Sequence, residues 1–169
     1  MTALDGVCQA ASTGIPVEAV ICGSGEMEKA LREKFQNEPS IVFAGWIDFP
    51  KYKTLATISD VSLAPYVVTE AFQLSIPNKV IDAFSFALPI FTPLGGEVGE
   101  LISGKGVGWV YEEKSPNSVS ELLFKIITNR SELSEKSNAA ITLFETQFNF
   151  DSVYGELEHR LTKLAFSFK

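Results

Sequence analysis

The sequence predicts an α/β domain in which a Rossmann-like parallel β-sheet carries helices on both faces. Five short apolar runs alternate with stretches whose apolar residues recur at helical spacing. Such alternation is typical of βαβ units, whose strands are parallel. The runs are also too uniformly apolar for an antiparallel sheet with one face in water. We therefore expect a single domain over residues 1–169.

The strand predictions rest on short apolar runs, several of which stop at a residue that begins a turn. Gly23 and Gly45 follow the first two runs, and Pro65 follows the third. The runs LPIFT and GWVY lie further along, between predicted helices. The predicted strands are 17–22, 40–44, 60–64, 88–92 and 108–111.

The helix predictions rest on apolar spacing and on start signals. Pro50 and Pro77 can occupy a first turn, where a missing N–H costs nothing, and Asn117 and Asp151 are predicted caps. The predicted helices are 1–12, 26–35, a short one from Pro50, 76–86, a brief one over 97–102, 117–128, 131–148 and 151–164. A sheet that begins with a helix lacks its preceding strand, which favours a piece of a longer chain.

Composition excludes several classes of function. The 169 residues include 14 Lys and Arg against 21 Asp and Glu, which gives a net charge of −7 and argues against a nucleic-acid partner. Two cysteines make no disulfide scaffold, and a single histidine, His159, makes no histidine-rich metal site. No apolar run approaches the roughly 20 residues of a membrane span. We expect no metal and a cytoplasmic location.

The candidate binding residues lie after the strands, where an open parallel sheet binds its ligands. Asn78 and Lys79 begin a helix after the longest loop, so free N–H groups and an ammonium group can meet an anion there. Asp82 shares a helix face with Lys79 and can accept hydrogen bonds from sugar hydroxyls. The alternatives are a solvated lysine and a Lys79–Asp82 surface ion pair.

Two glycine-containing turns give weaker evidence of a binding site. The turn 23–25, Gly-Ser-Gly, resembles a phosphate-binding turn, but Glu28 stands where a dinucleotide fingerprint needs a third glycine. We therefore favour a plain strand-to-helix turn, and a nicotinamide-dependent oxidoreductase is disfavoured. The turn 95–97, Gly-Gly-Glu, allows close approach of a ligand to the backbone.

Five sequence motifs that occur in a fixed order identify a family more specifically than any one of them does alone. They are VICGSG at 20–25, VFAGWI at 42–47, ATISDVSLAP at 56–65, IPNKVIDAF at 76–84 with LPI at 88–90, and GGEVGELI at 95–102 with GWV at 108–110. In this order, from about residue 17 to the C-terminus, the sequence resembles the C-terminal domain of family 4 retaining glycosyltransferases of the GT-B fold.

The resemblance implies one half of a two-domain enzyme. An N-terminal domain, absent from this chain, would bind the acceptor, and this domain would bind a nucleotide-diphosphate sugar as donor. Gly45, Trp46 and Ile47 would then meet the base through their backbone, and Asn78 and Lys79 would meet the diphosphate. Asp82 falls where the family carries its ribose-binding glutamate. No metal cofactor is implied, because helix dipoles and basic residues neutralise the leaving diphosphate.

The sequence also departs from the family. The first glutamate of the family's Glu-x7-Glu motif falls on Leu74, so Glu70, four residues earlier, is the candidate catalytic replacement. Ala87 stands where a glycine usually follows the helix. The family's basic Arg and Lys pair is not in this chain, so we expect the chain alone to be inactive.

The resemblance predicts sugar transfer to a glycan or lipid-linked acceptor in cell-surface polysaccharide biosynthesis, with the whole protein at the inner face of the membrane. The alternative is a non-catalytic Rossmann-like domain that serves protein–protein interaction.

Overall fold

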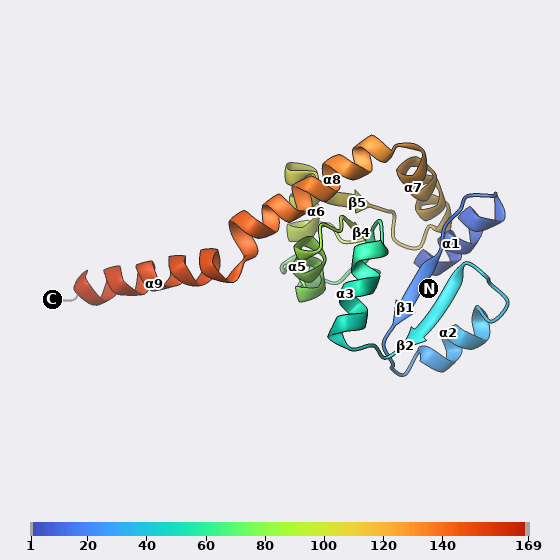
Figure 1. The fold of residues 1–169 in the computed structure, drawn as a ribbon, viewed down its shortest axis with the longest axis horizontal. Coiled ribbons are helices and arrows are strands. Elements are labelled where there is room, and N and C mark those ends of the chain that lie inside the picture. Colours follow the sequence, from blue (N-terminus) through green and yellow to red (C-terminus); the bar gives the residue numbers. More distant parts are fainter. Residues whose placement is uncertain (1, 168–169) are drawn as a thin grey trace.

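The computed structural model describes residues 2–167, and it confirms the predicted α/β architecture (Figure 1). The strands are β1 (Ala19–Cys22), β2 (Ile41–Gly45), β3 (Ser62–Leu63), β4 (Ile90–Thr92) and β5 (Gly108–Val110). The first helices are α1 (Thr2–Ser12), α2 (Glu28–Lys34), α3 (Phe49–Ile58), α4 (Glu70–Gln73) and α5 (Asn78–Ser85). The later ones are α6 (Gly96–Lys105), α7 (Pro116–Thr128), α8 (Arg130–Leu143), the π-helical turn η1 (Phe144–Phe148) and α9 (Phe150–Ser167).

The strands pair in parallel, but they form two sheets. One sheet has the order β1-β2, with Val20 opposite Val42, and the other has the order β3-β4-β5, with Leu63 opposite Phe91. The predicted parallel pairing is confirmed. The division between β1 and β3 is not apparent from the sequence.

Helices cover the larger sheet on both faces. Successive side chains of a strand point to opposite faces, and on β4 Ile90 and Phe91 enter different apolar clusters. Phe91 packs with α1 and α7, a cluster that also takes Ile21 of β1 and Leu63 of β3. Ile90 packs with α5, α6 and α8 around Phe84. Helix α9 leaves this body and extends away from it (Figure 1).

Three local predictions are wrong. Ser115, not Asn117, caps α7: its side chain accepts the Ser118 N–H at 3.2 Å, because Pro116 already occupies the first helical position. Asn149, not Asp151, caps α9, since its side chain accepts the Ser152 N–H at 2.8 Å. The helix predicted over 97–102 is longer and ends only at Gly106, whose φ of 69° terminates it.

Ala87 adopts a backbone conformation that suits glycine. It links α5 to β4 with a φ of 57°, where a Cβ atom crowds the neighbouring carbonyl. Ala87→Gly should therefore raise the free energy of unfolding by about 0.5–1 kcal/mol, the relief of strain outweighing the extra freedom of glycine in the unfolded chain. Urea denaturation measures the change. Ala83→Gly, within α5, is the control and should destabilise; destabilisation by Ala87→Gly would contradict the argument.

Candidate functional site

The carboxyl ends of β1 and β2 are joined by a short hydrogen bond. The Gly23 N–H donates to the Gly45 carbonyl at 2.7 Å. Both residues have a positive φ, 116° and 68°, which a side chain would strain. The turn 23–25 therefore lies beside Gly45, at the strand ends where a ligand of an α/β sheet binds.

A pocket of about 280 Å³ opens over this turn. Its walls come from β1, the turn 23–25, α2, Phe43 of β2 and, from a distant part of the chain, Lys79 of α5. The fold thus brings Lys79 to the Gly-Ser-Gly turn. The sequence favoured a plain turn at 23–25, and in the structure the same turn also forms a wall of the pocket.

Lys79 contributes to this pocket a positive charge that no carboxylate among the described residues neutralises. Glu28 lines the pocket, but the Arg32 Nε lies 2.9 Å from its carboxylate. Within residues 2–167, Lys79 takes part in no ion pair, and the Lys79–Asp82 surface pair does not form. A lysine without a carboxylate partner at the rim favours an anionic ligand.

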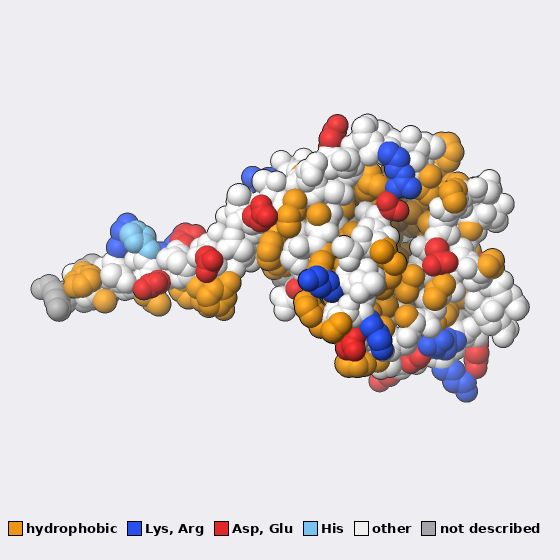
Figure 2. All heavy atoms as spheres, in the orientation of Figure 1, with side chains coloured by type: hydrophobic (Ala, Val, Ile, Leu, Met, Phe, Trp, Pro, Cys, Tyr) orange, Lys and Arg blue, Asp and Glu red, His pale blue; other side chains and the backbone are white. Residues whose placement is uncertain are grey.

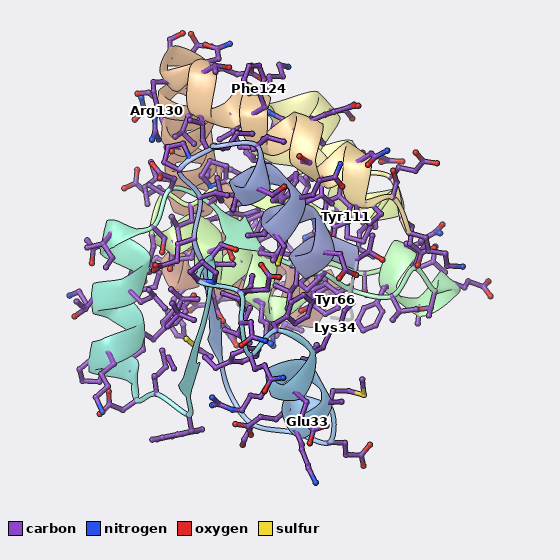
Figure 3. All side chains as sticks on the ribbon, turned by 90° about the vertical axis from the view of Figure 1, so that its right-hand side faces the viewer. Glu33, Lys34, Tyr66, Tyr111, Phe124 and Arg130 are labelled. Carbon is purple, nitrogen blue, oxygen red and sulfur yellow. The ribbon has the colours of Figure 1, made fainter. Side chains whose placement is uncertain are left out.

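Arg32 is a nearby cation that sequence reasoning missed. Its guanidinium carbon lies 5.0 Å from the centroid of the Phe43 ring, and a side chain on Gly45 would meet its Nη2 at 4.0 Å. The sequence shows only that Glu28 and Arg32 are four residues apart, a spacing that allows an ion pair on a helix. It does not show that this pair lies beside Phe43 and Gly45. Helix α2 itself is tied to α1 by the Lys34–Asp5 ion pair, and Lys34 and Glu33 are labelled in Figure 3.

Asn78 and Lys79 are the first residues of α5. Pro77 precedes them in an extended conformation, and no side chain caps the helix. The first N–H groups of an uncapped helix lack intrahelical partners and carry the positive end of its dipole. Asn78 is exposed, so this end of α5 is open to an anion.

Asp82 lies one turn further on α5 and is exposed, but it does not line the pocket. Its negative charge, added to the larger effect of burial, raises the pKa of Tyr52 and of Tyr66. The carboxylate is therefore near tyrosines from α3 and from the segment after β3; Figure 3 labels Tyr66. Lys79 therefore lines the pocket, whereas Asp82 lies near Tyr52 and Tyr66.

The three residues of the predicted base-binding turn lie in different surroundings in the structure. Gly45 lies beside the pocket, Trp46 is 76% exposed, and Ile47 lines a different cavity between β1 and α3. Glu70 is the exposed first residue of α4, whose Thr69 cap accepts the Phe72 N–H at 3.3 Å, and it does not line the pocket either.

Cys22 lies at the edge of the pocket as a free thiol. Burial raises the pKa of this thiol, so it stays protonated at neutral pH and is a poor nucleophile. In the part of the chain that the structure describes, no cluster of His, Cys, Asp and Glu gathers that could hold a metal ion. Likewise, no described helix is both long and apolar enough to cross a bilayer.

A family model for glycosyl transferases group 1 matches residues 2–129. The chain belongs to this family. The group 1 domain is 24% identical over 167 residues to the putative colanic acid biosynthesis glycosyltransferase WcaL of Escherichia coli, which covers 96% of the chain and 41% of the relative. It is 21% identical over 119 residues to the chitobiosyldiphosphodolichol beta-mannosyltransferase of Debaryomyces hansenii, covering 67% of the chain and 25% of the relative. The chain thus spans less than half of either relative.

Solved structures place the group 1 domain in the GT-B fold. HepE of Anabaena, in complex with UDP-glucose, matches 94% of the chain and 44% of its own length with a TM-score of 0.74 at 15% identity. Sucrose-phosphate synthase of Thermosynechococcus elongatus matches 99% of the chain and 43% of its own length, with a TM-score of 0.75 at 13% identity. The resemblance to a GT-B glycosyltransferase domain is therefore confirmed at this level.

Proposed function

We propose that this group 1 domain is the C-terminal, donor-binding half of a family 4 retaining glycosyltransferase. The complete enzyme would move a sugar from a nucleoside diphosphate to a glycan or lipid-linked acceptor in cell-surface polysaccharide biosynthesis. Family membership supports glycosyl transfer. The UDP-glucose complex of HepE supports the donor, and the similarity to WcaL, a colanic acid biosynthesis glycosyltransferase, supports the pathway.

The observation that carries the proposal is the pocket between the Gly-Ser-Gly turn and Lys79. A diphosphate here would meet the Lys79 ammonium and the free N–H groups at Asn78 and Lys79, with Arg32 near the β2 side. In this proposal Lys79 and the start of α5 would stabilise the leaving diphosphate without a metal cofactor. Gly45 lies beside the turn, where its backbone can meet the base.

Asp82 is proposed as the ribose ligand and Glu70 as the candidate catalytic carboxylate. Both are exposed and lie on α5 and α4, outside the pocket walls. Their participation requires a ligand that reaches past Lys79 toward α4.

The acceptor site is proposed to lie outside these residues. The chain spans 25% and 41% of the two relatives named above, which leaves room for an N-terminal acceptor domain in the complete protein. We expect the chain alone to bind donor without transferring sugar, and the complete protein to act in the cytoplasm at the inner face of the membrane.

Titration calorimetry with UDP and UDP-glucose tests the proposal. Lys79→Ala should weaken binding by about 10-fold to 100-fold, because a hydrogen bond to a charged group contributes about 1.5–3 kcal/mol. Lys29→Ala is the matched control, since Lys29 is an exposed lysine of α2 outside the pocket, and it should leave the Kd unchanged. Equal affinity of the Lys79→Ala and wild-type chains would place the donor elsewhere.

A non-catalytic interaction domain is the second candidate. It is favoured by α9, whose exposed apolar residues Phe150, Val153, Tyr154 and Leu157 recur at helical spacing. Hydrophobic side chains follow one side of this helix in Figure 2. Such a stripe is typical of a surface that pairs with another protein. If this candidate holds, none of the nucleoside diphosphates UDP, GDP, ADP and CDP binds in the same calorimetric experiment.

A further inference from the structure

The side chain of Arg32 is held by three neighbours beside the donor pocket. Its Nε donates to the Glu28 carboxylate at 2.9 Å, one turn back along α2. Its guanidinium carbon lies 5.0 Å from the centroid of the Phe43 ring, and its Nη2 lies near Gly45. Glu28 and Phe43 are walls of the pocket, and Gly45 borders it, so the guanidinium lies at the edge of the pocket on the β2 side.

Two sequence periodicities place the guanidinium there. Residues four apart share a helix face, and an acidic residue ahead of a basic one is the favourable order. Since α2 starts just after the turn 23–25, an Arg32 side chain directed at Glu28 also points toward the carboxyl ends of β1 and β2. On β2, Phe43 and Gly45 are two residues apart and share a face. Gly45 has no side chain to fill the space that the guanidinium occupies.

Charge distinguishes Arg32 from Lys79, the other cation of this site. Lys79 has no ion-pair partner among the described residues, whereas Arg32 has the Glu28 carboxylate. A phosphate that approached Arg32 would also approach Glu28, and repulsion by this carboxylate would offset the attraction of the guanidinium. The phosphates of a ligand are therefore better placed at Lys79, and the Arg32–Glu28 pair suits an uncharged part of the same ligand.

A flat, uncharged ring fits the exposed part of Arg32. The Arg32 side chain is 44% exposed, although Glu28 and Phe43 both hold it. A guanidinium group is planar and more weakly hydrated than an ammonium group, and it stacks on aromatic rings. Nucleobases stack on aromatic side chains and on arginine, because every base has a π-face. With Phe43 beneath it, Arg32 offers such a stacking surface in a fixed position.

We propose that Arg32, supported by Phe43 and held by Glu28, is the surface on which the nucleobase of the donor stacks. The base then lies over the end of β2 beside the Gly45 backbone, and the diphosphate reaches across the pocket to Lys79. This inference rests on the proposed donor-binding function. It adds a residue of α2 to the site and assigns that residue to the base rather than to the phosphates.

Titration calorimetry of the chain with UDP and with pyrophosphate, a diphosphate without a base, tests the proposal. The wild-type chain should bind UDP more tightly than pyrophosphate. Arg32→Lys keeps the positive charge and the helix propensity but loses the planar group. It should weaken UDP binding by about 5-fold to 20-fold and leave the Kd of pyrophosphate within about 2-fold, because only UDP has a base to stack. An unchanged Tm checks that the variant folds normally.

Arg160→Lys is the matched control. Arg160 lies four residues after Glu156 on α9, and its Nε donates to the Glu156 carboxylate at 3.0 Å, as Arg32 does to Glu28. Helix α9 extends away from the body that holds the pocket (Figure 1). The control thus changes an arginine in the same kind of ion pair, and it should alter the Kd of neither ligand.

Three results would overturn the role of Arg32. They are an equal loss of UDP and pyrophosphate binding in Arg32→Lys, which would make Arg32 a phosphate ligand, an unchanged Kd for UDP, and wild-type binding of UDP no tighter than that of pyrophosphate. Lys79→Ala separates this failure from failure of the donor site. If Lys79→Ala weakens UDP binding and Arg32→Lys does not, the donor pocket stands and the base lies elsewhere. If the wild-type chain binds neither ligand, both proposals are wrong.

Discussion

Phe84→Ala is expected to lower the free energy of unfolding by about 3–5 kcal/mol, the usual cost of removing a buried aromatic ring. Phe84 is 0% exposed and lies at the centre of the cluster that joins α5, α6 and α8 to β4. Its neighbours Ile90, Leu94 and Val98 are equally buried, so they cannot move into the cavity without losing their own contacts.

Urea denaturation followed by circular dichroism measures the loss. Phe124→Ala is the control, because Phe124 is 57% exposed on α7 and its removal should cost less than about 1 kcal/mol. A loss for Phe84→Ala no larger than that of the control would mean that this cluster is not packed as the structure shows.

Gly96→Ala is expected to destabilise the chain by about 2–5 kcal/mol, the sum of left-handed strain and overpacking. Gly96 has a φ of 53°, and a Cβ atom there would lie 2.1 Å from the Gln73 carbonyl oxygen. That oxygen belongs to the last residue of α4, which lies against the start of α6. The substitution therefore pushes α4, and with it Glu70, away from the body.

Differential scanning calorimetry gives the size of the effect, a decrease in Tm of about 5–15 °C for a chain of this length. Gly95→Ala is a control from the adjacent position, since no atom lies within 4 Å of its added Cβ and its φ is −85°. Equal Tm values for the two variants would show that the approach of α4 to α6 is not as close as described.

The elements that the sequence predicts well are those specified by local pattern. Apolar periodicity and flanking glycine or proline predict α1, α3 and α5 to within a few residues. Helix α4 lies between the predicted strand 60–64 and the predicted helix 76–86, and the sequence does not predict it, because four residues are too few for periodicity to appear. The division into two sheets depends on which strands pair, and pairing is a non-local property that strand patterns do not contain.

The site was predicted in parts. The sequence points separately to Lys79 and to the turn 23–25, but their meeting in one pocket depends on how α5 packs against the end of β1. Adjacency in the sequence groups Ile47 with Gly45, yet the chain turns after β2 and Ile47 lines the cavity beneath α3. The sequence does not indicate Arg32, because its importance comes from Phe43 and Gly45 of another element.

The stability of helix α9 depends on whether another molecule covers its apolar side. Phe150 and Leu157 are more than 40% exposed, and local contacts such as the Phe150–Tyr154 ring pair, with centroids 4.4 Å apart, hold the helix together. Most of the stability of a helix in a protein comes from packing of its apolar face, and the apolar residues of α9 are largely exposed. Any molecule that covers the apolar stripe adds its binding free energy to the stability of the helix. Folding of the 18 residues of α9 and association are then linked equilibria, and the fraction of chains with an ordered α9 depends on the concentration of whatever binds it.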